Sequence, residues 1–100
     1  FNGKAGVLYR GQLSLTTCLQ LGEGGALITG NTNLAPLKLK ESVVISLFLP
    51  NIGGIVALAQ CVYRAENQSM GLQFEQLSTD NKVKIREFVS RRKAIQVDVS

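Results

Sequence analysis

The sequence contains no histidine and no tryptophan, and its carboxylates are few. Histidine is the side chain that most often acts as a general base near neutral pH, so its absence removes the Ser-His and Cys-His pairs of nucleophilic catalysis. The seven Asp and Glu residues show no paired spacing of the kind that glycosidases or cation sites use. We therefore expect a binding or regulatory module with no catalytic residue, no metal and no cofactor.

Cysteine is scarce, and long apolar runs are missing. Cys18 and Cys61 lack CxxC spacing, which argues against a metal knuckle or a disulfide scaffold and favours a reducing cytoplasm. We expect both to be small buried core residues. The longest apolar stretch, residues 43–61, is interrupted by Pro50, so no segment reaches the roughly 18 to 20 residues of a membrane helix. Because the chain opens at Phe1 without an initiator Met, we expect it to be a domain of a larger protein, and the cysteine usage favours a cytoplasmic location.

What is present suits one compact domain. The 100 residues are 45% hydrophobic and 18% charged, with a net charge of +4, which is too apolar for a disordered chain. The positive charge is concentrated near the carboxyl end and is compatible with an anionic partner. As an ordinary alternative, it forms a solvated helix face. The candidate partner-binding residues are Lys82, Arg86, Arg91, Arg92 and Lys93.

Apolar residues at every second position predict strands over most of the chain. The clearest is 12–21, where Leu13 and Leu15 share one face with 17, 19 and 21, and Ser14 shares the other with 16, 18 and 20. We expect the side of this strand that carries residues 13, 15, 17, 19 and 21 to be buried. Further strands are predicted at 7–10, 26–29, 43–49, 55–64 and 70–74, and the strand at 55–64 is expected to be buried on both faces.

The period changes only after residue 77. Ile85, Phe88 and Val89 form an i, i+3, i+4 apolar stripe, and Ser78, Thr79 or Asp80 can cap a helix. The fold class predicted is mainly β: a six-stranded antiparallel β-barrel with one C-terminal amphipathic α-helix. The barrel is expected over about 5–77, the helix over about 79–92, and a tail over 94–100.

The segment 19–28 resembles the signature loop of PilZ domains, in which Asp or Asn, any residue, Ser, two residues and Gly follow one another. Here Gln20, Gly22 and Gly25 occupy the Asp/Asn, Ser and Gly positions. The later elements match in order, including a Gly-x-x-Phe strand at Gly71 to Phe74 and a final helix that ends near Phe88. The resemblance covers most of residues 5–90.

The resemblance implies a cytoplasmic module of bacterial cyclic di-GMP signalling, with outputs such as motility or exopolysaccharide synthesis. In the family, an Arg-x-x-x-Arg pair binds phosphate and guanine, and the Asp/Asn and Ser side chains add hydrogen bonds. Here Gln20 offers only a neutral carbonyl acceptor, Gly22 offers no hydroxyl, and Arg10 has no second arginine four residues away. The candidate ligand-binding residues are Arg10, Gln20, Gly22 and Gly25.

These departures predict weak or absent nucleotide binding. A hydrogen bond to a charged group contributes about 1.5 to 3 kcal/mol, so the loss of two or three weakens binding by roughly two to five orders of magnitude. We therefore expect a protein-interaction role, with a protein partner and no DNA, and oligomerisation is compatible with the basic helix. One alternative is a true cyclic di-GMP receptor whose arginine pair lies upstream of residue 1. The other is a basic barrel that binds single-stranded nucleic acid by stacking bases on exposed aromatic side chains.

Overall fold

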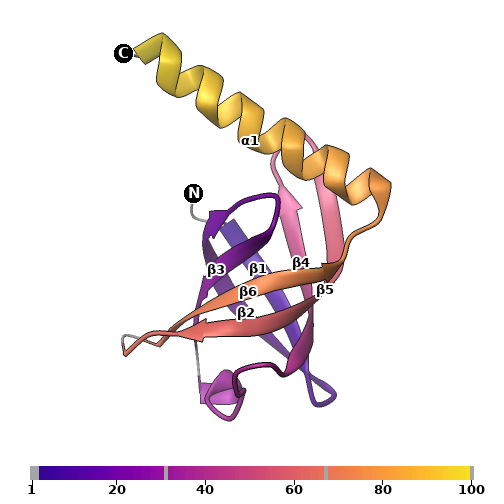
Figure 1. Ribbon diagram of the computed structural model, residues 1–100, viewed down its shortest axis with the longest axis vertical. Coiled ribbons are helices and arrows are strands. Elements are labelled where there is room, and N and C mark those ends of the chain that lie inside the picture. The colour runs from indigo at the N-terminus through magenta and orange to yellow at the C-terminus, as the bar shows by residue number, and fades with distance from the viewer. Residues whose placement is uncertain (1–2, 31, 67, 100) are drawn as a thin grey trace.

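The computed structural model describes residues 3–30, 32–66 and 68–99, with side chains described as far as Arg91. Six antiparallel strands form a closed barrel in the order β1-β2-β3-β6-β5-β4. This arrangement confirms the predicted fold class (Figure 1). The strands are β1 (Gly3–Tyr9), β2 (Gln12–Leu21), β3 (Gly25–Thr29), β4 (Ser42–Leu49), β5 (Gly53–Arg64) and β6 (Ser69–Gln76).

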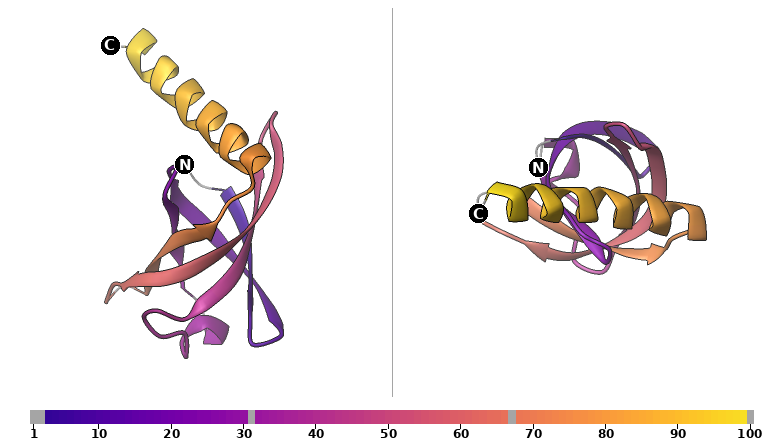
Figure 2. Two further views of the ribbon diagram at one scale, coloured as in Figure 1. Left: turned by 45° about the vertical axis from the view of Figure 1, so that its right-hand side comes forward. Right: turned by 90° about the horizontal axis from the view of Figure 1, so that it is seen from above.

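One helix, α1 (Thr79–Val99), follows β6 and crosses one end of the barrel, as the view from above shows (Figure 2). Ile85 and Phe88 are its buried contacts, and Val89 is partly buried against the same core. The helix continues to Val99, through most of the 94–100 segment that was expected to be a tail. No glycine or proline interrupts the sequence between Thr79 and Val99, so nothing in the chain favours an earlier end.

The opposite end of the barrel is closed by the connection between β3 and β4. It contains a short 3-10 helix, η1 (Thr32–Leu34), and it buries Leu34 and Leu37 completely. Sequence reasoning placed a loop here without recognising these two leucines as core residues. Because Gly30 and Pro36 interrupt the pattern, neither leucine belongs to a period of two or of 3.6 that would have marked it as buried.

Over residues 13–18 the buried face of β2 is the reverse of the predicted one. Leu13 and Leu15 are 64% and 78% exposed, whereas Ser14 and Cys18 are buried. The pairing with β1 fixes this choice, because Ser14 lies opposite Val7, which is fully buried. The hydroxyl of Ser14 has no hydrogen-bond partner among the described residues. The two leucines thus lie on the outer surface, while the Ser14 hydroxyl is buried without a hydrogen bond to the described residues, which is unfavourable for folding. After the register shift between Cys18 and Gln20 the predicted face is inside again, since Leu21 packs against the core and Gln20 is exposed.

The prediction that β5 is buried on both faces is also wrong. Its odd-numbered positions from Ile55 to Cys61 point into the core, but Val56 is 60% exposed and Val62 is 48% exposed. Neither residue is covered by another layer, since the single helix lies across the barrel end and not along its wall (Figure 2). The apolar residues of β5 therefore lie on two different surfaces: the odd-numbered ones are in the core, and Val56 and Val62 are on the outside of the barrel.

Both cysteines belong to the core, as predicted. Cys18 and Cys61 are fully buried and unbridged. Burial raises the pKa of the Cys18 thiol to about 11, and it raises the pKa of Cys61 in the same direction. A buried thiol that stays protonated is a poor nucleophile, because the thiolate is the reactive form.

We predict that neither thiol is alkylated at an appreciable rate in the folded protein at pH 8. With a pKa near 11 the thiolate fraction of Cys18 falls by about a hundredfold or more relative to a free cysteine. Mass spectrometry after iodoacetamide treatment should show two modifications only when the chain is unfolded first. Rapid modification of the folded chain would show that the barrel opens far more often than its packing implies.

Candidate functional site

The loop between β2 and β3 is the centre of the candidate site. Its turn is closed by the N–H of Gly22, which donates to the carbonyl of Gly25 at 2.9 Å. The carbonyl of Gly24 accepts from the N–H of Phe74 on β6, also at 2.9 Å. The loop is therefore anchored to a strand distant in sequence, and its backbone is held in one position.

Gly25 is required by a close approach of two backbones. A Cβ atom at this position would lie 2.1 Å from the carbonyl oxygen of Leu72 on β6. A positive φ is not the reason for the glycines of this loop, since none of Gly22, Gly24 and Gly25 has one. Gly22 and Gly24 face open space, with no atom within 4 Å of an added Cβ. The loop can thus accept side chains at 22 and 24 but not at 25.

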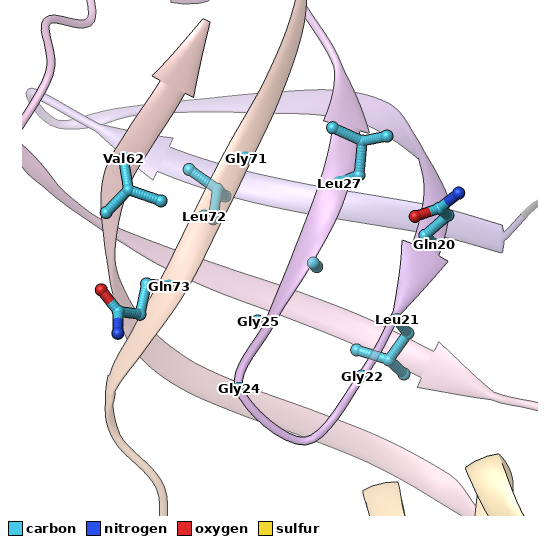
Figure 3. Close-up of a pocket in the computed structure, with 11 residues that line it drawn as sticks. Gln20, Leu21, Gly22, Gly24, Gly25, Leu27, Val62, Gly71, Leu72 and Gln73 are labelled. Atoms are coloured by element: carbon cyan, nitrogen blue, oxygen red, sulfur yellow. The ribbon is translucent and has the colours of Figure 1, made fainter.

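An open depression of about 600 Å³ lies beside this loop, on the outer surface of β2, β3, β6 and β5 (Figure 3). None of the described residues that line it is charged, and its polar side chains are Gln20 and Gln73. The lining residues are Gln20, Leu21, Gly22, Gly24, Gly25, Ala26, Leu27, Val62, Gly71, Leu72 and Gln73.

The structure brings three of the four predicted ligand-binding residues together here. Gln20 is placed by an irregularity in the register of β2 between Cys18 and Gln20, after which Gln20 lies opposite Leu27. Its exposed amide stands at the edge of the depression, and Gly22 and Gly25 follow at the loop (Figure 3). This part of the site offers an amide, backbone groups and an apolar floor on which a flat ring can rest.

Arg10, the fourth predicted residue, lies elsewhere. It occupies the turn between β1 and β2, at the opposite end of β2 from Gly22, and a ten-residue strand separates the two by roughly 30 Å. Its guanidinium lies 3.6 Å from Glu41 and stacks over the ring of Tyr9 at 5.0 Å. Arg64, at the end of β5, donates to the carbonyl of Leu37. Both cations serve the end of the barrel that lies away from the loop.

Glu41 organises that far end. It accepts hydrogen bonds from the N–H of Lys38 at 2.8 Å and from the hydroxyl of Tyr9 at 2.9 Å. These bonds hold the pKa of the Glu41 carboxyl below its ordinary value, with the Lys38 bond as the largest cause. Burial, aided by Glu41, raises the pKa of Tyr9. The cluster fixes the segment that closes the barrel, and this role accounts for Arg10 without a ligand.

The basic residues of α1 are partly neutralised. Arg86 lies 3.2 Å from Glu23 in the β2–β3 loop, and Arg91 lies 2.6 Å from Glu87 on the helix. Lys82 lines a cavity of about 160 Å³ with Glu23, Ile85 and Arg86. Lys82 itself has no ion-pair partner among the described side chains. Arg92 and Lys93 lie outside the side chains that the structure describes.

Sequence reasoning missed the contribution of β6 and the role of Glu23. Gly25 pairs with Gln73 and Leu27 with Gly71, so β6 supplies one wall of the depression. No local pattern signals this pairing, because it follows from barrel closure. Glu23, treated as a loop residue, joins the loop to α1 through Arg86.

Aromatic side chains do not form a base-stacking platform among the described residues. Phe48 and Tyr63 are 64% and 53% exposed, whereas Tyr9 and Phe88 are buried. Phe48 lies opposite Gly54, at the other end of β5 from Tyr63. The two exposed rings are therefore too far apart to stack consecutive bases.

The structure also bears on membrane insertion and on metal binding. The described part of the chain holds no helix long and apolar enough to cross a membrane. Among the same residues, no group of three Cys, Asp or Glu side chains could hold a metal ion.

Comparison with known families finds a match over most of the chain. The family model described as the PilZ domain matches residues 1–91, which is most of the chain. No curated protein matches the sequence.

We predict that Gly25→Ala destabilises the fold by more than about 2 kcal/mol, since its Cβ would overlap the Leu72 carbonyl and one of the two strands must move. Gly24→Ala is the matched control in the same loop, and we expect a change within about 0.5 kcal/mol. Urea unfolding followed by circular dichroism measures both. Equal stability of the two variants would show that β3 and β6 separate easily at this point.

Proposed function

This chain belongs to the PilZ domain family, whose members are modules of cyclic di-GMP signalling, and we propose that it is a regulatory domain whose own contacts bind the nucleotide weakly or not at all. PilZ domains are binding modules and not enzymes. In this reading the chain acts by contacting a protein partner, and the basic part of α1 offers that partner a surface.

The observation that carries this proposal is the absence of charge from the depression beside the loop. Cyclic di-GMP carries two phosphates, and binding them normally requires guanidinium or ammonium groups. The described lining residues include no arginine or lysine. Arg86 of α1 contacts the β2–β3 loop, but it is already paired with Glu23 at 3.2 Å. A dianion placed here would meet two amide side chains and the backbone.

The two departures from the family motif weaken the site further. The amide of Gln20 accepts a hydrogen bond with one neutral oxygen, whereas a carboxylate accepts with charge and roughly doubles the strength of the bond. At Gly22 no atom fills the space that a serine hydroxyl would occupy. Weak nucleotide binding therefore has a local chemical cause in an otherwise well-anchored loop.

The basic helix face supports a partner role, although its free charge is smaller than the sequence implies. Lys82 pairs with no carboxylate of the described residues, whereas Arg86 and Arg91 each have one. These ion pairs are exposed and contribute little to stability. The carboxylates of an acidic partner can therefore replace Glu23 and Glu87 as partners of the two arginines with little loss of free energy. The same partner would reach the β2–β3 loop through Glu23 and Arg86.

Restoring the motif should restore affinity. We predict that the double variant Gln20→Asp, Gly22→Ser binds cyclic di-GMP at least tenfold more tightly than the unaltered chain, because two charge-assisted or hydroxyl hydrogen bonds are regained. Gly22 has open space for the new hydroxymethyl group. Isothermal titration measures the gain.

Gly24→Ser is the matched control for this experiment, since residue 24 also faces open space but is not a motif position. It should leave the affinity unchanged. If the double variant and this control behave alike, the loop is not the nucleotide site and the proposal is wrong.

A second candidate function, a true receptor completed by an upstream arginine pair, is favoured by the path of β1. Gly3 pairs with Cys18, four residues before Gly22, so the chain enters the barrel at the end where the β2–β3 loop lies (Figure 1). Arginines that precede residue 1 would therefore start beside the loop. They could supply the cations that the depression lacks.

Any natural sequence that precedes Phe1 tests this candidate. If it contains an Arg-x-x-x-Arg pair, we predict that the extended chain binds cyclic di-GMP at least a hundredfold more tightly than residues 1–100, since two guanidinium contacts are added. Replacing both arginines with Gln should abolish the gain. An extended chain with the affinity of the short one would leave the interaction role as the function.

A further inference from the structure

The barrel carries a second surface, remote from the β2–β3 loop, that is apolar where a barrel exterior is normally polar. Five large side chains on β1, β2, β4 and β5 point outward and are 42% to 78% exposed. We call this surface the leucine face. It consists of Leu8, Leu13, Leu15, Phe48 and Val56.

The leucine face is continuous across four paired strands. Leu8 lies opposite Leu13 on β2 and opposite Val44 on β4. One row further along, Gly6 lies opposite both Leu15 and Ser46, and Ser46 lies opposite Val56. Directly opposite residues on one face are about 5 Å apart. The apolar side chains therefore form one patch.

The patch contains an open groove. The small residues Gly6, Ser46 and Gly54 form the floor of an open groove of about 330 Å³. Leu13 and Leu15 of β2 and Phe48 of β4 are among the other residues that line it. A surface that presents both large exposed side chains and a groove lined by small residues can pack against a copy of itself, as an isologous interface requires.

The register of β2 places Leu13 and Leu15 on the outer surface. Burying hydrophobic area alone would favour Leu13 and Leu15 inside and the serine outside. The structure does the reverse, and it leaves the hydroxyl of Ser14 buried without a partner among the described residues. This arrangement becomes favourable once the outward leucines are themselves covered.

The exposed area matches one half of a dimer interface. At the exposures found, the five side chains present on the order of 600 Å² of apolar surface. A stable dimer buries about 800 Å² per partner, of which roughly two thirds is apolar when the partners are identical. The leucine face and its immediate rim therefore supply what one subunit contributes.

The small number of charged residues around the groove indicates an apolar partner. Lys4 is the one charged residue among the described residues that line the groove, and Lys84 lies beside it, where its Nζ donates to the carbonyl of Gly54 at 3.2 Å and pairs with Asp80 at 3.3 Å. An acidic protein or a nucleic acid would find little complementary charge here, and an anionic membrane would favour a rim with several unpaired cations. A second apolar face of the same shape is the complement that the chain itself provides.

We propose that two copies of this chain associate through their leucine faces as a symmetric dimer. This inference goes beyond the proposed function and does not depend on it. In the barrel order, β1 and β4 are neighbours on the side opposite the neighbours β3 and β6. The dimer consequently leaves the β2–β3 loop and its depression open on each copy.

Sedimentation equilibrium of the chain from 5 to 200 μM tests the proposal. We expect a reversible dimer in this range, and we expect Leu13→Lys to weaken association at least a hundredfold, since it buries a charge in the interface. Leu39→Lys is the matched control, because Leu39 is 56% exposed but lies in the connection before β4, outside the leucine face. It should associate like the unaltered chain.

Three results would overturn the proposal: a monomer at 200 μM, a Leu13→Lys variant that associates as tightly as the unaltered chain, or an unaltered monomer that instead sediments with anionic lipid vesicles. Circular dichroism checks that each variant is folded. If Leu13→Lys does not fold, Val56→Lys on β5, also within the leucine face, replaces it, and the same results decide the question.

Discussion

The pairing of β3 with β6, which closes the barrel, depends on a close approach of the two backbones at two glycines. At Gly25, where β3 begins, an added Cβ would lie 2.1 Å from the Leu72 carbonyl oxygen, and at Gly30, just past its end, an added Cβ would lie 2.3 Å from that of Gln68. β3 is the shortest strand, with five residues, and it joins the β1–β2 half of the barrel to β6. These contacts set the position of the β2–β3 loop, and through Glu23 and Arg86 they connect it to α1.

Much of this fold could be predicted from the sequence. Period-two patterning located all six strands, and the change of period after residue 77 located the helix. What could not be predicted for every strand was which face is buried. In β2 the leucines suggested one face, but the register with β1 places Ser14 opposite the buried Val7. A strand pattern reports alternation, and only the partner strand decides which half of the pattern points inward.

The candidate site was predictable in part for a similar reason. Gln20, Gly22 and Gly25 are local in sequence, so their motif could be seen directly. Gln73 reaches the same depression only through the pairing of β3 with β6. Arg10 is close to Gln20 in sequence but lies at the other end of β2, because a strand carries its two ends far apart. Sequence distance and spatial distance therefore disagree in both directions.

The family scaffold, the anchored loop and the uncharged depression together describe a PilZ domain that keeps its architecture and has little left to hold a dianion. The most direct test is an NMR titration of the unaltered, ¹⁵N-labelled chain with cyclic di-GMP up to millimolar concentration. The account predicts either no change or small fast-exchange shifts, confined to residues 20–27 and 71–73, that do not saturate below about 1 mM. Saturation at low micromolar nucleotide would contradict it.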